Sequence, residues 1–272
     1  DLLSKPDLFA GFEPPVRLAV IGDPIAHSKS PAFQNAALHA CGIPVAYARL
    51  HVPPSDFAKV LRALSGAGFL GANVTIPHKA SALAGVDVAD AYARASGSVN
   101  TIVVSGEKLH GFNTDGPGIS RAIREEFSRD LRDLRVVLVG AGGGAGRAIA
   151  VQCAMEKCAR LVLVNRTFEK AQLLAAELAP YFLSEPTSGS DDRVVAIRLE
   201  DGDLRRELKN ADILINATSL GMDRSDAPVV AASLLHSNLL VYDAVYTRGG
   251  SRLLDDAVAA GARAANGLGM LL

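Results

Sequence analysis

Val136-Val-Leu-Val-Gly-Ala-Gly-Gly-Gly-Ala145 sets the fold class of this chain. Its first four residues are apolar, and three are β-branched, which is typical of a strand buried on both faces of a parallel sheet. Glycines follow at once, and a stretch with helical spacing comes after them. Strands of the same type recur at 161–164, 213–215 and 239–241. This strand–helix alternation predicts a doubly wound parallel sheet.

The first hundred residues alternate in the same way. A helix is expected over 31–41, with its apolar residues on one face and Ser30 as its N-cap. We further expect strands over 16–21, 45–52 and 71–76, helices over 55–64 and 87–95, a hairpin formed by 99–104 and 108–112, a helix after the turn at 113–116, and a loop over 185–193.

The predicted fold class is therefore α/β, with two domains. The first, 1–115, is an α/β domain with a mainly parallel sheet. The second, 116–250, is a Rossmann-like, doubly wound domain, and 251–272 are expected to return towards the first. Two domains also fit the length of 272 residues, at roughly 150 residues per domain.

Composition excludes several classes of protein. The 28 basic and 29 acidic residues leave a formal charge of −1, which argues against a nucleic-acid or membrane-surface binder. No apolar run is long enough for a transmembrane helix, and the N-terminus lacks the pattern of a signal peptide. The three cysteines show no CxxC and the six histidines no HExxH, so we expect no metal. The cysteines fit a reducing cytoplasm, and a plastid stroma would fit them equally.

The glycine-rich turn reads G-x-G-x-x-A, the pattern of a dinucleotide-binding loop. In this interpretation Gly140 allows the tight turn, and Gly142 lets the backbone approach a pyrophosphate at the start of the next helix. The predicted loop contacts are Gly140, Ala141, Gly142, Gly143, Gly144 and Ala145.

The residues after the next strand indicate which dinucleotide binds. An NAD site usually has an acidic residue there for the ribose 2′-hydroxyl. This chain has Asn165-Arg-Thr167 instead, with Lys170 one turn further on. The Arg166 guanidinium suits a 2′-phosphate, so NADP is the predicted cofactor. Arg147 is a second candidate for phosphate contact. The alternative is that Arg166 and Lys170 are merely solvated residues at the start of a helix.

Three polar clusters lie at the ends of elements in the first domain. Ser28 and Ser30 suit a carboxylate, although Ser30 would serve equally as a helix cap. The second cluster consists of Asn73, Thr75 and Lys79, although a single Lys is normally a solvated surface residue. The third consists of Asn113-Thr-Asp-Gly116, with Asn100 upstream. It is first of all a turn signal, and Asp115 would also suit a helix cap.

Together these clusters resemble the shikimate dehydrogenase family in order and spacing, from Arg17 onward. The matching motifs are His27-Ser-x-Ser-Pro31, Asn73-Val-Thr-x-Pro-x-Lys79, Val99-Asn-Thr101, Asn113-Thr-Asp-Gly116, Gly140-Ala-Gly-Gly143, Asn165-Arg-Thr167, Asn216-Ala-Thr218, Gly221-Met222, Asp243-x-x-Tyr246 and Gly267-Leu-Gly-Met270.

The resemblance implies NADP-dependent, reversible reduction of 3-dehydroshikimate to shikimate, in a groove between two domains. It implies Lys79 and Asp115 as the catalytic pair, and a small-molecule substrate. It implies substrate contacts at Ser28, Ser30, Asn73, Thr75, Asn100 and Tyr246. It implies further cofactor contacts at Thr218, Met222, Gly267 and Met270.

A lysine at position 79 suits the chemistry of ketone reduction. Hydride arriving at a ketone leaves negative charge on oxygen, and an ammonium stabilises that charge and supplies the proton. Burial would lower the pKa of Lys79 and the Asp115 carboxylate would raise it, so the proton transfer is assigned to the pair.

Other members of the family offer alternative functions. The first alternative is a quinate/shikimate dehydrogenase with broader substrate use. The second is a non-catalytic ligand sensor on the same fold. Both a monomer and a homodimer are compatible with the sequence. The family pattern continues past Met270-Leu into a helix that carries a substrate-contacting Gln, so we expect the complete protein to extend beyond Leu272.

Overall fold

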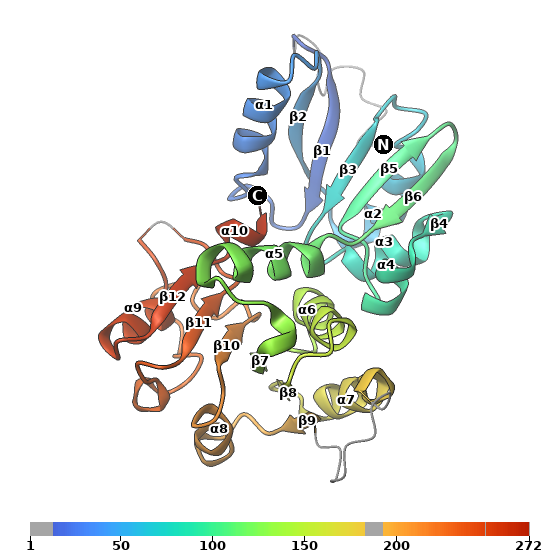
Figure 1. Cartoon of the computed structure of the whole chain (residues 1–272). Coiled ribbons are helices and arrows are strands. Elements are labelled where there is room, and N and C mark those ends of the chain that lie inside the picture. The colour runs from blue at the N-terminus through green and yellow to red at the C-terminus, as the bar shows by residue number, and fades with distance from the viewer. Residues whose placement is uncertain (1–12, 183–192, 248, 272) are drawn as a thin grey trace. The chain divides into compact units, whose positions relative to one another are not determined.

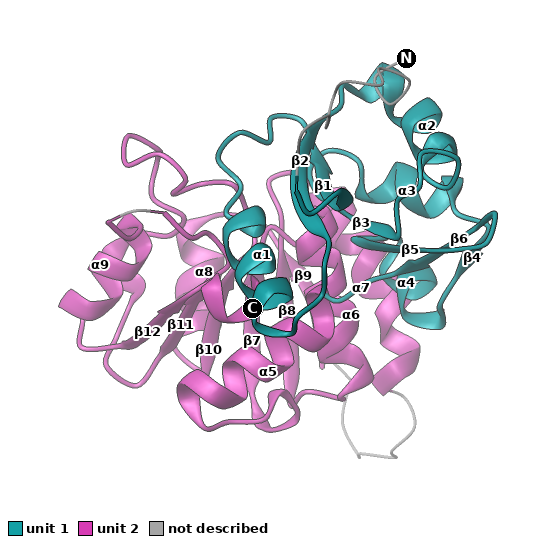
Figure 2. Ribbon diagram, turned by 90° about the horizontal axis from the view of Figure 1, so that it is seen from above, with its two compact units in different colours: residues 1–114 teal, residues 115–272 magenta. Residues whose placement is uncertain are grey.

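The computed structural model describes residues 13–182, 193–247 and 249–271. The chain forms two compact units, 1–114 and 115–272, which Figure 2 shows in teal and magenta. Their boundary lies one residue before the position expected from the turn cluster. Residues 183–192, which include most of the expected 185–193 loop, lie outside the described residues. In the three described stretches no helix combines the length and apolarity needed to cross a membrane.

The first unit is built on a mixed six-stranded sheet of order β2-β1-β3-β5-β6-β4 (Figure 1). Its first three strands are mutually parallel, and β5 and β6 form the expected antiparallel hairpin. The strands are β1 Val16–Gly22, β2 Ala46–His51, β3 Gly71–Val74, β4 Val88–Ala89, β5 Thr101–Ser105 and β6 Lys108–Phe112; the helices are α1 Ser30–Ala40, α2 Pro54–Ala63, α3 Lys79–Gly85 and α4 Ala91–Ser96.

Alternation along β1 divides the core of this unit between the two faces of the sheet. Val20 packs with Tyr47 and, from α1, Leu38. Ala19 and Ile21 belong to a separate and larger cluster. The two faces are thus covered by different helices, and α1 lies on the face that carries Tyr47.

Three expectations for this unit were wrong in detail. The helix expected over 87–95 is a short strand, β4, followed by α4. Asp90 separates them, because its carboxylate accepts the Ala93 N–H at 2.6 Å and caps α4. Helix α3 was not expected. Helix α1 begins at Ser30 itself and its N-cap is Lys29, so Ser30 is not the cap.

The second unit contains a fully parallel sheet of order β12-β11-β10-β7-β8-β9, the doubly wound order (Figure 1). Strands β9 and β12 were not expected. The strands are β7 Arg135–Val139, β8 Arg160–Val164, β9 Val194–Ile197, β10 Ile213–Asn216, β11 Leu240–Asp243 and β12 Arg263–Asn266; the helices are α5 Asp115–Phe127, α6 Gly144–Met155, α7 Phe168–Phe182, α8 Asp201–Leu208, α9 Arg252–Ala259 and α10 Leu268–Leu271.

Residues 251–271 belong to this second unit, and their expected return towards the first domain stays a prediction. Strand β12 pairs with β11 through four residue pairs, and the buried Leu253 and Ala257 bring α9 into the core. Helix α10 packs on α5, where a Cβ on Gly118 would lie 2.9 Å from the Met270 carbonyl oxygen. Burial of this apolar surface explains why the segment stays with the second sheet.

Candidate functional site

The glycine loop joins β7 to α6, at the point where the strand order reverses between β7 and β10. Gly140 has a φ of +91°, which favours glycine. A Cβ at Gly140 would lie 2.7 Å from Thr218 Cγ2 and 2.8 Å from the Thr218 nitrogen. The loops after β7 and β10 therefore touch through this glycine, at the place where open α/β sheets bind ligands.

Close packing of helix against strand depends on Gly146, one residue after the last position of the G-x-G-x-x-A pattern. A Cβ at Gly146 would lie 2.1 Å from the Gly140 carbonyl oxygen. Helix α6 starts only at Gly144, with Gly143 as its N-cap, so the contact falls one residue later than the motif suggests. The signal was present in the sequence as one more glycine, but the motif offered no position for it.

Asn165 connects the glycine loop to the end of β8. Its Oδ1 accepts the Gly142 N–H at 3.2 Å, and its Nδ2 donates to the Thr167 carbonyl at 2.9 Å. A Cβ at Gly142 would lie 2.9 Å from Asn165 Nδ2. Gly142 is thus required by the asparagine that follows β8, in addition to any ligand.

The predicted phosphate contacts after β8 are exposed. Arg166, Thr167 and Lys170 all lie at the surface, and no side-chain partner of Arg166 or Lys170 is found among the described residues. Arg147, the second candidate, forms an ion pair with Glu177 of α7. Arg166 is therefore the better placed of the two guanidinium groups for a ligand.

These features fit a dinucleotide with a 2′-phosphate. The amides at the start of α6 suit a pyrophosphate. The three residues directly after β8, Asn165-Arg-Thr167, include no carboxylate that would repel a further phosphate, and Arg166 offers a planar set of donors there.

A buried polar network lies at the ends of β10 and β11. Asn216 donates to Asp243 at 2.8 Å, Ser251 also donates to Asp243, and the Val245 N–H adds a bond of 3.0 Å. Asn216 and Asp243 are fully buried. Burial raises the pKa of the Asp243 carboxyl, although these bonds oppose the rise. The sequence showed both residues inside motifs but did not indicate this network.

The network extends to Thr218. Thr218 donates its hydroxyl to Asn216 Oδ1 at 2.8 Å and accepts the Leu220 N–H at 3.1 Å. Because Thr218 contacts Gly140, the buried network fixes one wall of the glycine loop.

The remaining predicted residues of this unit lie on the segments that follow β10, β11 and β12. Met222 is half exposed, and Tyr246 is partly buried, which raises its pKa. Gly267 packs against the chain, since its Cβ would lie 2.1 Å from the Ala244 carbonyl oxygen. The Met270 N–H donates to the buried Tyr242 hydroxyl at 3.2 Å.

In the first unit, the two predicted serines adjoin at the start of α1. The Ser30 N–H donates to Ser28 Oγ at 3.3 Å, and both residues are less than a tenth exposed. Neither hydroxyl donates to another group in the part of the chain that the structure describes. Arg49 Nε of β2 donates to the Ser28 carbonyl at 2.9 Å. Two available hydroxyl donors beside a helix start suit a carboxylate.

The predicted asparagines are joined by a chain of hydrogen bonds. Asn73 Nδ2 donates to Thr101 Oγ1 at 3.2 Å, and Thr101 donates to Asn100 Oδ1 at 2.9 Å. Asn100 Nδ2 then donates to Thr114 Oγ1 at 3.0 Å, and the Thr114 N–H returns a bond of 3.0 Å. The structure therefore brings together the ends of β3, β5 and β6. A row of oriented amides and hydroxyls is suited to a polyhydroxylated ring.

Lys79 and Asp115 each begin a helix beside this row. Lys79 is the first residue of α3, and its carbonyl accepts the Val99 N–H at 2.9 Å, next to Asn100. Asp115 is the first residue of α5, 9% exposed, and directly follows Thr114. Thr75 lies at the end of β3, partly buried, where its N–H donates to the Ile21 carbonyl at 2.9 Å.

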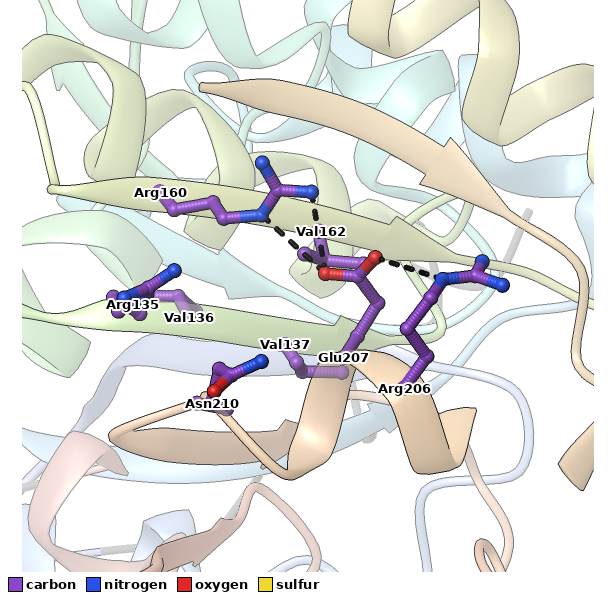
Figure 3. A pocket seen from close by; sticks show the side chains of 9 residues that line it. Arg135, Val136, Val137, Arg160, Val162, Arg206, Glu207 and Asn210 are labelled. Atoms are coloured by element: carbon purple, nitrogen blue, oxygen red, sulfur yellow. Dashed lines mark hydrogen bonds and ion pairs between the residues drawn. The ribbon is translucent and has the colours of Figure 1, made fainter. Parts of the chain in front are cut away.

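A cavity of about 170 Å³ lies at the opposite, amino-terminal end of β7 and β8 (Figure 3). Its wall carries Arg135, Arg160 and Arg206, and Glu207 lies between the last two. The Glu207 carboxylate is 3.2 Å from Arg160 and 3.6 Å from Arg206. Two of the three arginines are thus already paired with Glu207, and no predicted site residue is among the described residues of this wall.

Comparison with known proteins identifies the family. Residues 20–102 match the model described as the shikimate dehydrogenase substrate binding domain, and 122–236 match that described as shikimate / quinate 5-dehydrogenase. A shikimate dehydrogenase (NADP(+)) from Methanopyrus kandleri is 40% identical over 94% of this chain and 86% of its own.

Solved structures agree with the sequence matches. Shikimate 5-dehydrogenase from Thermus thermophilus, in complex with NADP(H) and shikimate, is 32% identical with a TM-score of 0.81, over 94% of this chain and 88% of that one. Quinate dehydrogenase from Corynebacterium glutamicum, in complex with NAD, is 28% identical with a TM-score of 0.81, over 94% and 89%. This chain therefore belongs to the shikimate dehydrogenase family.

Proposed function

We propose that this protein catalyses the reversible, NADP-dependent reduction of 3-dehydroshikimate to shikimate. The observation that carries the proposal is a set of polar groups in the first unit. It consists of the two serine hydroxyls at the start of α1 and the two asparagine amides that hydrogen bonds orient. Those groups suit one carboxylate and several ring hydroxyls, which is the chemistry of shikimate. The relatives named shikimate dehydrogenase support the same reading.

The two units have different roles in this proposal. The first unit holds the substrate, and the match to a substrate binding domain over 20–102 spans Ser28, Asn73 and Asn100. The second unit holds NADP: α6 would receive the pyrophosphate, and Arg166 the 2′-phosphate. Thr218, Met222, Gly267 and Met270 belong to the segments at the carboxyl end of the second sheet, where the rest of the cofactor would bind.

Lys79 and Asp115 carry out the proton transfer. NADPH supplies the hydride to the ketone carbon when it is bound. The Lys79 ammonium stabilises the negative charge that develops on the oxygen and donates a proton to it. In the oxidation direction the Lys79 amine accepts the proton of the substrate hydroxyl and passes it to the Asp115 carboxylate. In the reduction direction the proton returns from Asp115 to Lys79. Tyr246 is a further proposed contact of the substrate.

A second candidate function is a quinate/shikimate dehydrogenase, which the likeness to a quinate dehydrogenase favours. That relative is in complex with NAD, whereas Arg166 follows β8 here and no carboxylate is present for a ribose 2′-hydroxyl. We therefore propose shikimate and NADP as the preferred pair.

One assay tests both candidates. Reduction of NADP⁺ is followed by its absorbance with shikimate and with quinate, and each substrate is repeated with NAD⁺. The proposal expects the largest kcat/KM for shikimate with NADP⁺. Faster turnover of quinate would favour the second candidate. Tight shikimate binding by calorimetry without turnover with any pair would indicate a ligand sensor.

The cellular setting follows the chemistry. We propose that the protein works in the cytoplasm, where NADPH is available and its three cysteines, none of them in a disulfide, stay reduced. It would act on a small molecule, as a monomer or a homodimer, and sedimentation analysis of the purified protein distinguishes these two.

A further inference from the structure

Strand β2 carries Tyr47, whose hydroxyl contacts Asn73, one of the two asparagines proposed to bind the substrate. The Tyr47 hydroxyl donates to Asn73 Oδ1 at 2.6 Å. Tyr47 is 5% exposed and packs against Val20 and Ile25, and this burial raises the pKa of its phenol. Burial therefore favours the protonated hydroxyl, which is the form that donates to Asn73.

The backbone of Tyr47 is held as firmly as its ring. The Asn35 side chain of α1 accepts the Tyr47 N–H at 2.8 Å and donates to the Tyr47 carbonyl at 2.9 Å. Among the described strands none pairs with the outer edge of β2, and these two bonds satisfy the backbone of Tyr47 there. Tyr47 thus has a fixed position from which to act on Asn73.

The consequence for Asn73 is a single amide orientation. Its Oδ1 is taken by Tyr47, so its Nδ2 is directed at Thr101 Oγ1 and, at 3.4 Å, at the Asn100 carbonyl. The amide torsion of Asn is broad and roughly two-fold, and packing alone chooses weakly between its two faces. The Tyr47 hydroxyl at Oδ1, together with the Asn100 carbonyl that can only accept from Nδ2, makes that choice.

The orientation passes along the row. Because Thr101 accepts from Asn73, its own proton is directed at Asn100 Oδ1, at 2.9 Å. Asn100 Oδ1 also accepts from the Thr114 N–H, so its Nδ2 faces Thr114 Oγ1. The Asn100 amide is therefore fixed from two sides, by Tyr47 through Asn73 and Thr101 and by the backbone N–H of Thr114.

We propose that Tyr47 is a positioning residue for substrate recognition, which fixes the Asn73 amide and, through Thr101, the Asn100 amide. This inference rests on the proposed function, because it takes Asn73 and Asn100 as contacts of the substrate hydroxyls. Tyr47 acts through Asn73 and needs no contact with the substrate. It takes no part in the proton transfer by Lys79 and Asp115.

The test is steady-state kinetics of Tyr47→Phe with shikimate and NADP⁺, with Tyr181→Phe as the control because Tyr181 is an exposed residue of α7. We expect the KM for shikimate to rise about tenfold, since one hydrogen bond is at stake. We expect kcat to stay within about threefold of wild type, and the NADP⁺ Kd to be unchanged. A merely structural tyrosine would lower the active fraction and leave KM as it was.

A double-mutant cycle makes the inference specific to Asn73. In an Asn73→Ala background, Tyr47→Phe should add less than a twofold change in KM, because the group it orients is gone. Thr101→Val removes the next bond of the row and should raise KM by a similar factor. It also serves as the test if Tyr47→Phe does not fold.

The outcomes separate this inference from the proposed function. If Asn73→Ala raises KM but Tyr47→Phe and Thr101→Val do not, Tyr47 positions nothing and the inference is wrong while the substrate site stands. Additive effects in the cycle would overturn it as well. If Asn73→Ala itself leaves KM unchanged, both the substrate site and the inference fail.

Discussion

Asn216 Nδ2 donates a hydrogen bond of 2.8 Å to Asp243 Oδ1, between the fully buried ends of β10 and β11. The same carboxylate accepts from Ser251 and from the Val245 N–H. The Asp243 carboxylate is the acceptor in all three of these hydrogen bonds. This relationship holds together two loops that carry predicted cofactor and substrate contacts, Thr218 and Tyr246.

Replacement of this carboxylate should destabilise the second unit. Asp243→Asn keeps the shape but turns one oxygen into an NH₂ that faces donors. We expect a loss of about 1–3 kcal/mol in the free energy of unfolding, measured by urea denaturation. Asp201→Asn, at an exposed position of α8, is the control and should change stability by less than about 0.5 kcal/mol. Equal stability of the two variants would contradict the role of the network.

The raised pKa of Asp243 gives a pH dependence. A carboxyl whose pKa is raised in the folded state binds more protons folded than unfolded, over the range between the ordinary value of about 3.9 and the raised one. Its contribution to stability is therefore full below that range and is lost as pH rises through it. In Asp243→Asn this loss should be absent, so the difference in unfolding free energy between wild type and variant should shrink as pH rises from about 4. Parallel pH profiles would refute the effect.

Much of this fold could be predicted from the sequence because its strands are unusually regular. Val136–Val139 and 161–164 are apolar throughout, since both faces of the parallel sheet are covered. The segment 87–95 could not be predicted, because Asp90 fits either the interior or the cap of a helix and only tertiary pairing of β4 with β6 decides. The role of Tyr47 could not be predicted for the same reason. An aromatic residue in a strand predicts a place in the hydrophobic core, and the hydroxyl contact with Asn73 joins residues 26 positions apart.

The glycines of α6 and α8 offer a matched pair of variants. Gly146→Ala would place a Cβ 2.1 Å from the Gly140 carbonyl oxygen, so we expect about 1–3 kcal/mol of destabilisation and a raised KM for NADP⁺. Gly202→Ala meets no atom within 4 Å and lies inside α8, so it should stabilise by about 0.5–1 kcal/mol. Thermal unfolding measures both. A neutral Gly146→Ala would refute close packing of helix and loop.

Arg166 should determine the choice between NADP and NAD. Arg166→Ala removes a charge-assisted contact worth roughly 1.5–3 kcal/mol, so we expect the KM for NADP⁺ to rise about 10- to 100-fold. The KM for NAD⁺ should change less than about threefold, because NAD lacks the 2′-phosphate. Arg147→Ala tests the other guanidinium and should have a small effect, since Arg147 pairs with Glu177. The reverse ranking of the two variants would move the phosphate site to Arg147.

Lys79 is the residue on which the proposed chemistry depends most. Lys79→Ala removes the donor that stabilises charge on the substrate oxygen, and such donors contribute about 10²–10⁴ in rate. We expect kcat to fall by that factor, with the KM for shikimate changed much less, because the proposed substrate contacts at Ser28, Asn73 and Asn100 remain. Lys59→Ala, on the exposed surface of α2, should leave both constants unchanged. Single-turnover experiments with NADPH and 3-dehydroshikimate distinguish loss of chemistry from loss of binding. Turnover of Lys79→Ala near that of the wild type would remove Lys79 from the mechanism and leave the proton transfer to another group beside Asp115.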